Sequence, residues 1–415
     1  MKKTFLFIAF GRLTLAAIVS AVGSVSAWGA SKTVTAEFNP DPANPMRNEF
    51  KNTTPSSGYC VPFPGVCASN GFFSLAMGIN ANANATIQAN HTDPRKGAMF
   101  KIPTDWRTVE VTHTATGEKE SLDVRISGLS VYHRFPVPAG DISGPGGHET
   151  MWTNRSWRYS PPPCTGNYTQ QNWANRYQSY WHFPENVGVC AKQAAFNIPD
   201  FEYIEQSFTY ELRTPKPLSM ATGDYTGAIT YTVGPGADFD WGDIMMPTDT
   251  LFTINFNLKV QHQLKVEIPP GGNKIELLPQ GGWQAWLNQG RKPTRLFRDQ
   301  IFNISSSGRF KMELGCQNPN GNTCALREPT SGHEVPLNIS VTLPNGLTNA
   351  AGQPVIRLPL LQDGIGTELF KPGFYVDRKS GALHFEITRE HVENMLTGDE
   401  KTYSGNVTVI WNSEV

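Results

Sequence analysis

Short runs in which apolar and polar residues alternate recur along the whole chain, and they constrain its fold more than any other feature. Examples are residues 33–38, 121–126 and 207–212. Alternation with a period of two turns one set of side chains toward a core and the other toward water, as in a half-buried β-strand. Turn-forming clusters such as residues 141–147 separate the runs. Long helical patterns are nearly absent, so the sequence predicts an all-β protein.

The first residues have the pattern of a secretory signal peptide. Lys2, Lys3 and Arg12 give a basic start, and the apolar stretch 13–23 is too short to span a bilayer. Small side chains precede Ala27 and place the cleavage site after it. We therefore expect residues 1–27 to be removed on export. The alternative, an uncleaved anchor, would need a longer apolar run.

Charged residues are sparse and balanced. They make up 17% of the 415 residues, and the formal net charge is −1. This balance argues against electrostatic capture of nucleic acid or of an anionic membrane. We expect no nucleic-acid partner. The length that remains after removal of residues 1–27 fits two or three domains of ordinary size.

Six cysteines form three pairs that are close in sequence. The pairs are Cys60 with Cys67, Cys164 with Cys190, and Cys316 with Cys324. In an exported chain an even number of cysteines predicts disulfide bonds. Six cysteines allow fifteen pairings, and nearest-neighbour pairing is our choice among them. Zinc is the alternative, but no Cys-x-x-Cys spacing occurs and no histidine lies at a ligand interval. We expect no metal site and no cofactor.

Two stretches share a Tyr-x-Gly start followed by a strand rich in β-branched residues. One is residues 224–233 and the other is residues 402–411. We predict that each of them is the closing strand of a β-sandwich. The consecutive runs 251–260 and 261–268 are expected to be the last strand of a first domain and the first strand of a second. These runs place a domain boundary near residue 260.

Further strands and one helix are expected in the second domain. The predicted strands are residues 300–304, 310–314, 335–343, 383–388 and 407–411. A short helix is predicted at residues 389–396, because Thr388 can cap its N-terminus.

Several motifs follow one another in a fixed order in the second half. They are Lys265-Val266-Glu267-Ile268, Gly281-Gly282-Trp283-Gln284-Ala285-Trp286, Phe302-Asn303-Ile304-Ser305-Ser306-Ser307, the Cys316 and Cys324 pair, Val341-Thr342-Leu343-Pro344, Leu383-His384-Phe385-Glu386-Ile387, and residues 403–411. In this order, the second half resembles the pilin domain of chaperone–usher fimbrial tip adhesins, especially the class 5 (colonisation-factor type) minor pilins and related pilus-initiator proteins. Residues 225–239 resemble the end of the receptor-binding domain of that family. Residues 28–215 match nothing that can be placed residue by residue.

The resemblance implies a fold and an assembly mechanism. It implies two immunoglobulin-like β-sandwich domains in tandem, with a receptor-binding domain at residues 28–260 and a pilin domain at residues 261–415. The pilin domain lacks its final strand. A periplasmic pilus chaperone, and then a major pilin subunit, supply that strand by donor-strand exchange. The resemblance further implies passage through an outer-membrane usher and a place at the fimbrial tip on the cell surface.

Segment 152–183 is the densest cluster of candidate binding residues, because aromatic rings alternate there with arginines. Rings stack on the apolar faces of sugars, and arginine holds a carboxylate or sulfate with two hydrogen bonds. We therefore predict a host glycan or glycoprotein receptor. The predicted contacts are Arg155, Arg158 and Arg176, with Trp157 and Trp173 as stacking partners. The alternative is that these rings form a core, which is their commoner role.

Motifs typical of enzymes or calcium sites do not occur. Residues 238–243 carry alternating acids but lack the twelve-residue calcium pattern, so we predict a turn with solvated carboxylates. No His-Glu-x-x-His, Gly-x-Ser-x-Gly or Walker sequence occurs. We expect a tip adhesin rather than an enzyme. Two alternatives stay open: a structural or initiating minor pilin without receptor binding, and a secreted β-sandwich glycan hydrolase, which would need two suitably spaced carboxylates.

Overall fold

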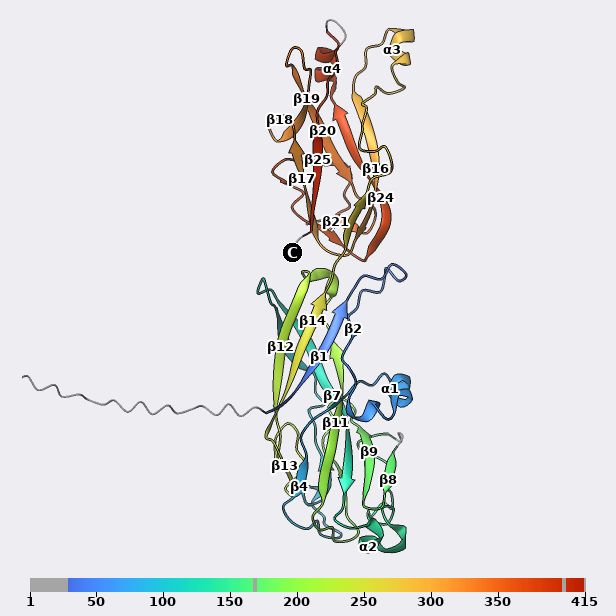
Figure 1. The fold of residues 1–415 in the computed structure, drawn as a ribbon, viewed down its shortest axis with the longest axis vertical. Helices are drawn as coiled ribbons and strands as arrows, with labels where there is room; N and C mark the ends of the chain where they lie inside the picture. The colour runs from blue at the N-terminus through green and yellow to red at the C-terminus, as the bar shows by residue number, and fades with distance from the viewer. Residues whose placement is uncertain (1–28, 167–169, 398–400, 414–415) are drawn as a thin grey trace, which may run out of the picture.

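Two β-rich domains lie end to end along the longest axis of the molecule (Figure 1). The computed structural model describes residues 29–166, 170–397 and 401–413. The predicted signal peptide, residues 1–27, lies outside the described residues. Within these ranges no helix is both long enough and apolar enough to cross a membrane. Strands dominate both domains, which confirms the prediction of an all-β chain.

The first domain is built around one large, curled sheet. Its strands lie in the order β13-β4-β11-β7-β6-β12-β14-β1-β2, with β3 and β9 paired to β11 and β7, and β8 paired to β9. A short second sheet joins β5 to β10. The elements are β1 (Ala30–Phe38), β2 (Lys51–Asn52), α1 (Pro64–Asn70), β3 (Ser74–Ala76), β4 (Ala81–Ala83), β5 (Ala98–Phe100), β6 (Arg107–His113), β7 (Lys119–Arg134), α2 (Ala139–Ser143), β8 (Gln171–Trp173), β9 (Arg176–His182), β10 (Cys190–Lys192), β11 (Glu202–Arg213), β12 (Gly223–Thr232), β13 (Met245–Pro247) and β14 (Leu251–Val260).

The second domain is a sandwich of two main sheets. The larger has the order β15-β16-β24-β20-β19-β18, with β22 beside β20, and the smaller has the order β21-β23-β17-β25. The elements are β15 (Leu264–Glu267), α3 (Gln284–Gln289), β16 (Leu296–Ser306), β17 (Phe310–Cys316), β18 (Pro319–Asn320), β19 (Thr323–Arg327), β20 (Glu334–Thr342), β21 (Leu347–Asn349), β22 (Leu358–Pro359), β23 (Phe370–Pro372), β24 (Val376–Ile387), α4 (Arg389–Met395) and β25 (Val407–Ser413).

Alternating burial is most regular in β14. Phe252, Ile254, Phe256, Leu258 and Val260 are at most 1% exposed, whereas the residues between them reach the surface. Each such buried side chain stabilises the fold by roughly 1.5–3 kcal/mol relative to an exposed one. β14 therefore lies at the centre of the first core.

The first domain ends with β14, as predicted for residues 251–260, although the sequence also predicted β12 as a closing strand. β14 pairs antiparallel with β12 along its whole length and parallel with β1 on its other side. The chain reverses between β12 and β14 with the help of Asp238. Its carboxylate accepts a hydrogen bond from the backbone N–H of Thr232 at 2.9 Å and pairs with Arg107 at 2.7 Å. β12 is consequently an inner strand of the sheet, between β6 and β14.

Tyr225 near the start of β12 anchors the strand to the preceding turn. Its hydroxyl oxygen accepts a hydrogen bond from the backbone N–H of Ala221 at 2.9 Å. A tyrosine bonded in this way to the backbone a few residues upstream is typical of immunoglobulin-like sandwiches. Tyr403, the equivalent residue before β25, instead forms a hydrogen bond with Nδ1 of His333 at 2.8 Å.

The prediction of solvated carboxylates at residues 238–243 is wrong for Asp240. Asp240 is 2% exposed and lies 2.7 Å from Nη1 of Arg95. Asp243 lies 2.8 Å from Nη2 of the same guanidinium, and the hydrogen bond to Arg95 lowers the pKa of Asp243. Arg95 is distant in sequence, so the local pattern could not reveal the pairing. Nowhere in the described part of the chain do three metal-ligating side chains come together.

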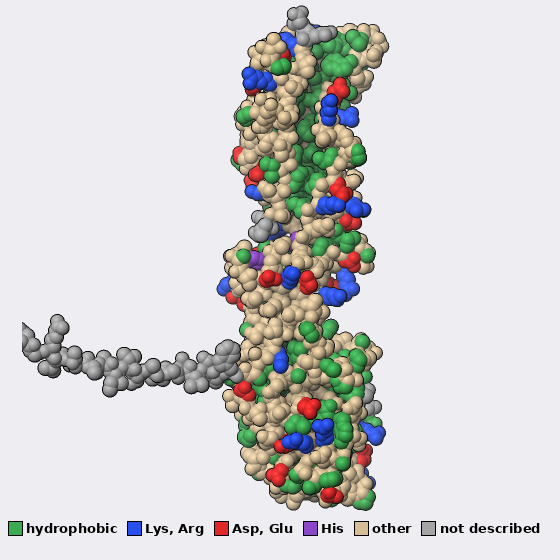
Figure 2. All heavy atoms as spheres, viewed as in Figure 1, with side chains coloured by type: hydrophobic (Ala, Val, Ile, Leu, Met, Phe, Trp, Pro, Cys, Tyr) green, Lys and Arg blue, Asp and Glu red, His purple; other side chains and the backbone are tan. Residues whose placement is uncertain are grey.

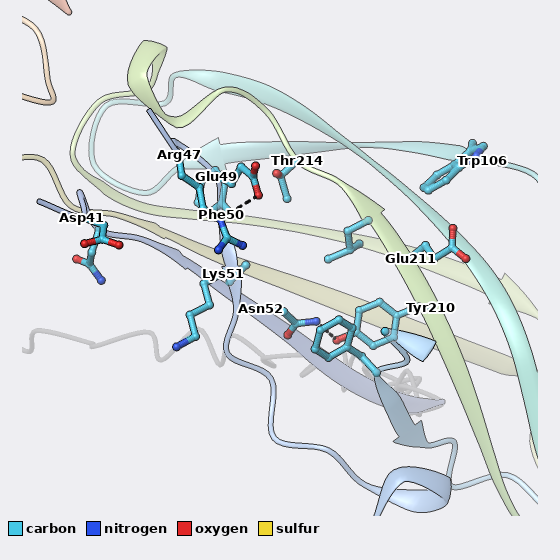
Figure 3. Close-up of a pocket in the computed structure, with 15 residues that line it drawn as sticks. Asp41, Arg47, Glu49, Phe50, Lys51, Asn52, Trp106, Tyr210, Glu211 and Thr214 are labelled. Atoms are coloured by element: carbon cyan, nitrogen blue, oxygen red, sulfur yellow. Dashed lines mark hydrogen bonds and ion pairs between the residues drawn. The ribbon is translucent and has the colours of Figure 1, made fainter. Parts of the chain in front are cut away.

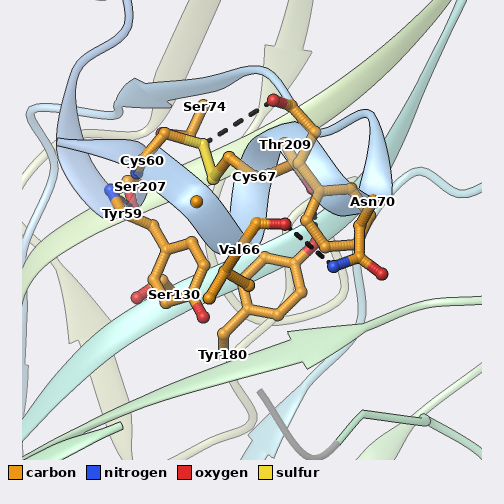
Figure 4. Close-up of a disulfide and its surroundings, with 12 residues drawn as sticks. Tyr59, Cys60, Val66, Cys67, Asn70, Ser74, Ser130, Tyr180, Ser207 and Thr209 are labelled. Atoms are coloured by element: carbon orange, nitrogen blue, oxygen red, sulfur yellow. Dashed lines mark hydrogen bonds between the residues drawn. A yellow bond between two sulfur atoms is a disulfide. The ribbon is translucent and has the colours of Figure 1, made fainter. Parts of the chain in front are cut away.

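All three nearest-neighbour cysteine pairs are joined, over sequence separations of 7, 26 and 8 residues. The Cys60–Cys67 disulfide closes a loop that contains the start of α1 and lies on β9 and β11 (Figure 4). Beside it, the ring of Tyr59 stacks on Tyr180 with centroids 4.7 Å apart. The backbone N–H of Tyr59 donates to Oγ of Ser207 at 3.1 Å. These contacts hold the loop firmly against the sheet.

Residues 261–263 connect the two domains. β14 ends at Val260 and β15 begins at Leu264, and no described strand of one domain pairs with a strand of the other. The Nε2 atom of His262 lies 2.9 Å from the carbonyl oxygen of Met220, and its ring lies 5.6 Å from that of Phe38. Burial lowers the pKa of His262. The division of the chain into residues 28–260 and 261–415 stays our proposal.

Candidate functional site

β25 and β15 of the second domain, like the short strands β18, β21 and β22, have a neighbour on one side only among the described strands. Among the strands that the structure describes, β25 pairs only with β17, and β15 pairs only with β16. The backbone N–H and C=O groups along such an edge are open to water or to a further strand. An edge of this kind is a template for pairing with another chain.

The apolar side chains of β25 point toward the second core without being fully covered. Val407, Val409 and Trp411 pack against buried core residues but remain partly exposed. The ring centroid of Trp411 lies 5.0 Å from that of Phe302 and 5.9 Å from that of Phe310. In β12, which shares the Tyr-x-Gly start of β25, Tyr225 and Tyr231 are buried and Ile229 is half-buried. β25 thus has an inward face that the domain leaves half open.

A stripe of hydrophobic side chains runs lengthwise over the second domain in Figure 2. It lies in the region between β25 and β16 of Figure 1. Partly buried apolar residues at the start of the domain also contact the second core. They are Leu264, Val266, Ile275, Leu277 and Trp283. A contiguous apolar surface of this kind marks a place of interaction with another protein.

The first domain shows how an equivalent edge is filled. β12 and β25 share the Tyr-x-Gly start, and β12 is covered by β14 along residues 223–232. β12 has a strand on each side, β6 and β14, whereas among the described strands β25 pairs with β17 alone. The chain therefore holds a complete version and an open version of the same strand arrangement.

The predicted binding segment 152–183 is mostly core. Six of its rings are at most 5% exposed: Trp152, Trp157, Tyr177, Tyr180, Trp181 and Phe183. Two rings are clearly exposed, Tyr159 at 49% and Trp173 at 40%. Tyr168 lies outside the described residues. The core alternative is therefore correct for these six rings, and Trp173 is the predicted stacking residue that presents its ring to solvent.

A pocket of about 570 Å³, here called the distal pocket, brings three predicted residues together. Trp157, Arg158 and Trp173 line it, together with His148 and Glu149. The pocket lies beside α2, at the end of the first domain that is farther from the second domain (Figure 1). The exposed ring of Trp173 can stack on a sugar, and the guanidinium of Arg158 can hold an acidic group.

The other two predicted arginines lie elsewhere. Arg176 does not line the distal pocket. Its guanidinium carbon lies 4.6 Å from the ring centroid of Trp173 and 5.2 Å from that of Tyr132, and its Nη1 lies 3.7 Å from Glu205. Arg155 is exposed, has a φ of +50° and does not line the distal pocket. Arg155, Arg158 and Arg176 therefore do not converge on a single binding site.

His148 holds one wall of the distal pocket. Its Nε2 atom donates to the carbonyl oxygen of Trp173 at 2.6 Å, and burial lowers its pKa. Its Nδ1 atom has no hydrogen-bonding partner among the described residues. Sequence reasoning missed His148 and Glu149, because residues 139–149 meet residues 157–173 only in the folded chain. The glycine-rich turn before His148 is the one local signal that a surface loop begins there.

A buried lysine fixes the backbone behind the distal pocket. Lys192 is 2% exposed, and its Nζ donates to the carbonyl oxygens of Ser156 at 2.9 Å and Trp157 at 3.0 Å. Burial lowers the pKa of Lys192 to about 7. The ammonium group thus ties the loop that carries Arg158 to β10.

Another cavity, of about 990 Å³, lies between β2 and β11 of the first domain (Figure 3). None of the predicted binding residues lines it. Two pairs of its polar groups are bonded to each other: Asn52 donates to the hydroxyl of Tyr210 at 2.9 Å, and Arg47 lies 3.6 Å from Glu49.

Comparison with known proteins gives matches among solved structures alone. No family model matches the sequence, and no curated protein matches it. CfaE, the adhesive subunit of the CFA/I fimbria of enterotoxigenic Escherichia coli, is 11% identical, with 93% of each chain covered and a TM-score of 0.24. The CsuC–CsuE chaperone–tip adhesion subunit complex of Acinetobacter baumannii Csu pili is 10% identical, with 92% of this chain and 98% of that chain covered and a TM-score of 0.22.

A CFA/I chaperone–tip adhesin complex also matches, at 10% identity and a TM-score of 0.22, over 93% of this chain and 97% of that chain. The matched proteins are tip adhesins, the class that the sequence resembles. At these TM-scores the backbones superpose too loosely to carry an argument about residue roles or function.

Proposed function

We propose that this chain is the tip adhesin of a chaperone–usher pilus. Residues 261–415 form the pilin domain that accepts a strand, and residues 28–260 form the domain that binds a receptor. The observation that carries the proposal is β25, with one neighbour and a half-covered apolar face. The first domain has the same place filled by β14.

A strand from another protein completes the second domain. Its backbone pairs with the free edge of β25, and its alternate apolar side chains cover Val407, Val409 and Trp411. The periplasmic chaperone supplies this strand before assembly, and the major pilin supplies it in the pilus. Without it, the open edge and the apolar stripe are sites of aggregation. The usher then exports the assembled chain to the cell surface.

The distal pocket is the proposed receptor site. It lies at the end of the molecule that is remote from the second domain, so attachment through β25 leaves it exposed beyond the pilus (Figure 1). Trp173 offers a stacking surface, and Arg158 offers a charged hydrogen-bond donor. A host glycan or glycoprotein fits this combination. The proposal makes the chain a binding protein rather than an enzyme.

The test is complex formation with the periplasmic chaperone of the same pilus. The chain carries an affinity tag after the signal peptide and is exported with or without the chaperone. We expect a one-to-one complex with the chaperone and aggregation without it. Val409→Asp places a charge on the inward face of β25 and should abolish the complex.

Thr408→Asp is the matched control, because Thr408 is exposed on the opposite face of the same strand. It should retain the complex. A chain that stays monomeric and soluble without chaperone, or a complex that both variants retain, would contradict strand acceptance at β25.

A further inference from the structure

The cavity of about 990 Å³ between β2 and β11, here called the side cleft, lies where the large sheet of the first domain does not close. β2 is the last strand of this sheet, and the sheet curls until β2 comes near β11. Asn52 of β2 donates a hydrogen bond to the hydroxyl of Tyr210 of β11 at 2.9 Å (Figure 3). No described strand lies between β2 and β11. The side cleft is therefore bounded by the edges of two strands.

The edge of β11 that borders the side cleft is open over part of its length. β3 covers the preceding residues, and no described strand covers residues 210–213 on this side. In β7, Ile126 lies opposite Tyr210 and donates its N–H to the carbonyl oxygen of Pro103 at 3.1 Å, not to β11. Every second pair of an antiparallel ladder shares this unbonded state. The N–H and C=O groups of Leu212 therefore point away from β7, and Leu212 lines the side cleft.

β2 has an open edge of the same kind on the other side of the cleft. Among the described strands it pairs with β1 alone. The N–H of Thr53 donates to the carbonyl oxygen of Thr35 at 3.0 Å, so by alternation the peptide groups of Lys51 also point to β1. Those of Phe50 and Asn52 point away from β1, and both residues line the side cleft. A strand inserted there would find backbone groups on both sides.

The walls of the side cleft combine aromatic rings with nearly balanced charge. Phe50 is half-buried and Phe73 is 41% exposed, so both rings can contact a ligand. Five charged side chains line the cleft: Asp41, Arg47, Glu49, Lys51 and Glu211. Arg47 lies 3.6 Å from Glu49. The buried Arg125 lies 2.6 Å from Glu211. One carboxylate and one ammonium group remain without an ion pair among the described residues, so a ligand of low net charge suits these walls.

We propose that the side cleft binds an extended peptide strand of low net charge that belongs to the receptor protein. The backbone of this strand pairs with Leu212 on one side and with Phe50 and Asn52 on the other. Its alternate side chains contact the rings of Phe50 and Phe73. Main-chain hydrogen bonds supply the affinity in this mode of binding, and the side-chain contacts supply the selectivity. The inference rests on the proposed adhesin function, and it adds polypeptide to the glycan as a part of the receptor that is recognised.

Hydrogen exchange of single backbone amides in the full chain tests the proposal. The probes are acetylated six-residue peptides in which serine alternates with valine, leucine or phenylalanine, the same peptides with glutamate or lysine in place of serine, and methyl galactoside. At least one serine peptide should bind and slow exchange of the Leu212 N–H at least about tenfold. The N–H of Glu211 points to β7 and should not change. Because the readout is local to β11, a peptide bound at β25 is not mistaken for one in the side cleft.

Changes in the peptide and in the chain sharpen the test. Methylation of alternate peptide nitrogens removes the donors of one edge and should weaken binding about fivefold or more, as the loss of a hydrogen bond predicts. Glu49→Trp fills the cleft from a side chain that is 69% exposed, so it should abolish binding at an unchanged melting temperature. Glu110→Trp is the matched control, because Glu110 is also an exposed partner of an ion pair but does not line the cleft. It should bind like the wild type.

Four results would overturn the proposal. They are that no serine peptide binds, that charged peptides alone or the galactoside protect Leu212, that Glu49→Trp binds like the wild type, or that the chain self-associates through the cleft, which would make a second copy the occupant. Each of them leaves the adhesin proposal standing, provided that the chaperone complex forms and the wild type attaches to host cells. Loss of the chaperone complex would overturn the adhesin proposal whatever the peptides do.

Discussion

Trp157 and Trp173 both line the distal pocket, but they differ in burial, and this difference separates a folding role from a binding role. Trp157 is 5% exposed and Trp173 is 40% exposed. Trp157→Ala should lower the free energy of unfolding by about 3–5 kcal/mol. Trp173→Ala should lower it by less than about 1.5 kcal/mol and should still weaken attachment to epithelial cells at least about tenfold. Urea unfolding and cell binding of the two variants check this. Equal losses of stability would contradict a binding role for Trp173.

Lys192 should make the stability of the first domain depend on pH. Burial lowers its pKa in the folded state to about 7, from an ordinary value of 10.5. Between these values the unfolded chain holds a proton that the folded chain has released, so the free energy of unfolding rises with pH. The slope is at most about 1.4 kcal/mol per pH unit. Below about pH 7 this contribution is flat.

Lys192→Met removes this slope, although it also leaves the carbonyl groups of Ser156 and Trp157 without their donor. The wild type should therefore gain stability relative to Lys192→Met as pH rises from about 7 to about 9. Lys101→Met, at an exposed position, is the control and should show no relative gain. Urea unfolding at several pH values measures the effect. Parallel pH profiles for wild type and Lys192→Met would show that Lys192 keeps its proton in the folded state.

The identity of the rings in segment 152–183 could be read from the sequence, but their burial could not. Alternation along β9 separates Tyr177 from Gln178 correctly, yet both are buried, because the disulfide loop covers the second face of this strand. The same limit applies to Asp240, whose partner Arg95 is remote in sequence. Residue type is local information, whereas burial and pairing depend on segments that meet only in the fold.

At the scale of elements, strand positions were predictable and strand partners were not. The predicted run 251–260 coincides with β14, predicted strands in the second domain fall within β16, β17 and β25, and the predicted strand 383–388 overlaps β24 except for its last residue. The twin sequences of β12 and β25 hid the main difference between them, which is the presence of β14 beside only one of the two. Strand pairing depends on which other strand lies alongside in the fold. The alternation of apolar and polar residues within one strand does not indicate that neighbour.

Helices were harder to predict than strands. α4 (Arg389–Met395) was predicted, although the side chain of Thr388 forms no cap hydrogen bond. α1, α2 and α3 were not predicted. Each has at most seven residues, which is too short to show the period of an amphipathic helix. Disulfide and turn geometry, rather than periodicity, hold such short helices in place.

The Cys316–Cys324 disulfide joins the end of β17 to β19 beside the open edge. Cys316→Ala should lower the free energy of unfolding of the second domain by about 2–3 kcal/mol, because a loop of about eight residues is no longer closed in the unfolded chain. Calorimetry of the full chain resolves this transition. A count of free thiols on denatured wild-type protein checks the pairing. A second-domain transition that does not shift would show that the bond contributes no stability there.

At the scale of the whole molecule, the proposed receptor binding and the proposed strand acceptance belong to different domains. The distal pocket lies at the far end of the first domain, and the apolar stripe runs along the second (Figures 1 and 2). Tandem sandwiches could be expected from length, turn spacing and the resemblance of the second half. The ligand could not be predicted, because residues 28–215 match nothing residue by residue and the pockets of the first domain join segments that are remote in sequence.

The central claim is that β25 accepts a strand from another protein, and donor-strand fusion tests it most directly. One donor is a copy of β14 (Leu251–Val260), which fills the equivalent place beside β12, and the other is the N-terminal extension of the major pilin of the same pilus. Each is joined after Val415 through a flexible linker. The control donor has its alternate apolar residues replaced by serine. Calorimetry of the full chain follows the second-domain transition.

The account predicts that at least one donor raises the melting temperature of the second domain by about 10 °C or more. Burying several apolar side chains adds several kcal/mol to the free energy of unfolding, and each kcal/mol raises the melting temperature by about 2–4 °C. The serine control should leave the transition unchanged. A second domain whose transition is the same with either donor, with the control and with no donor would contradict the claim.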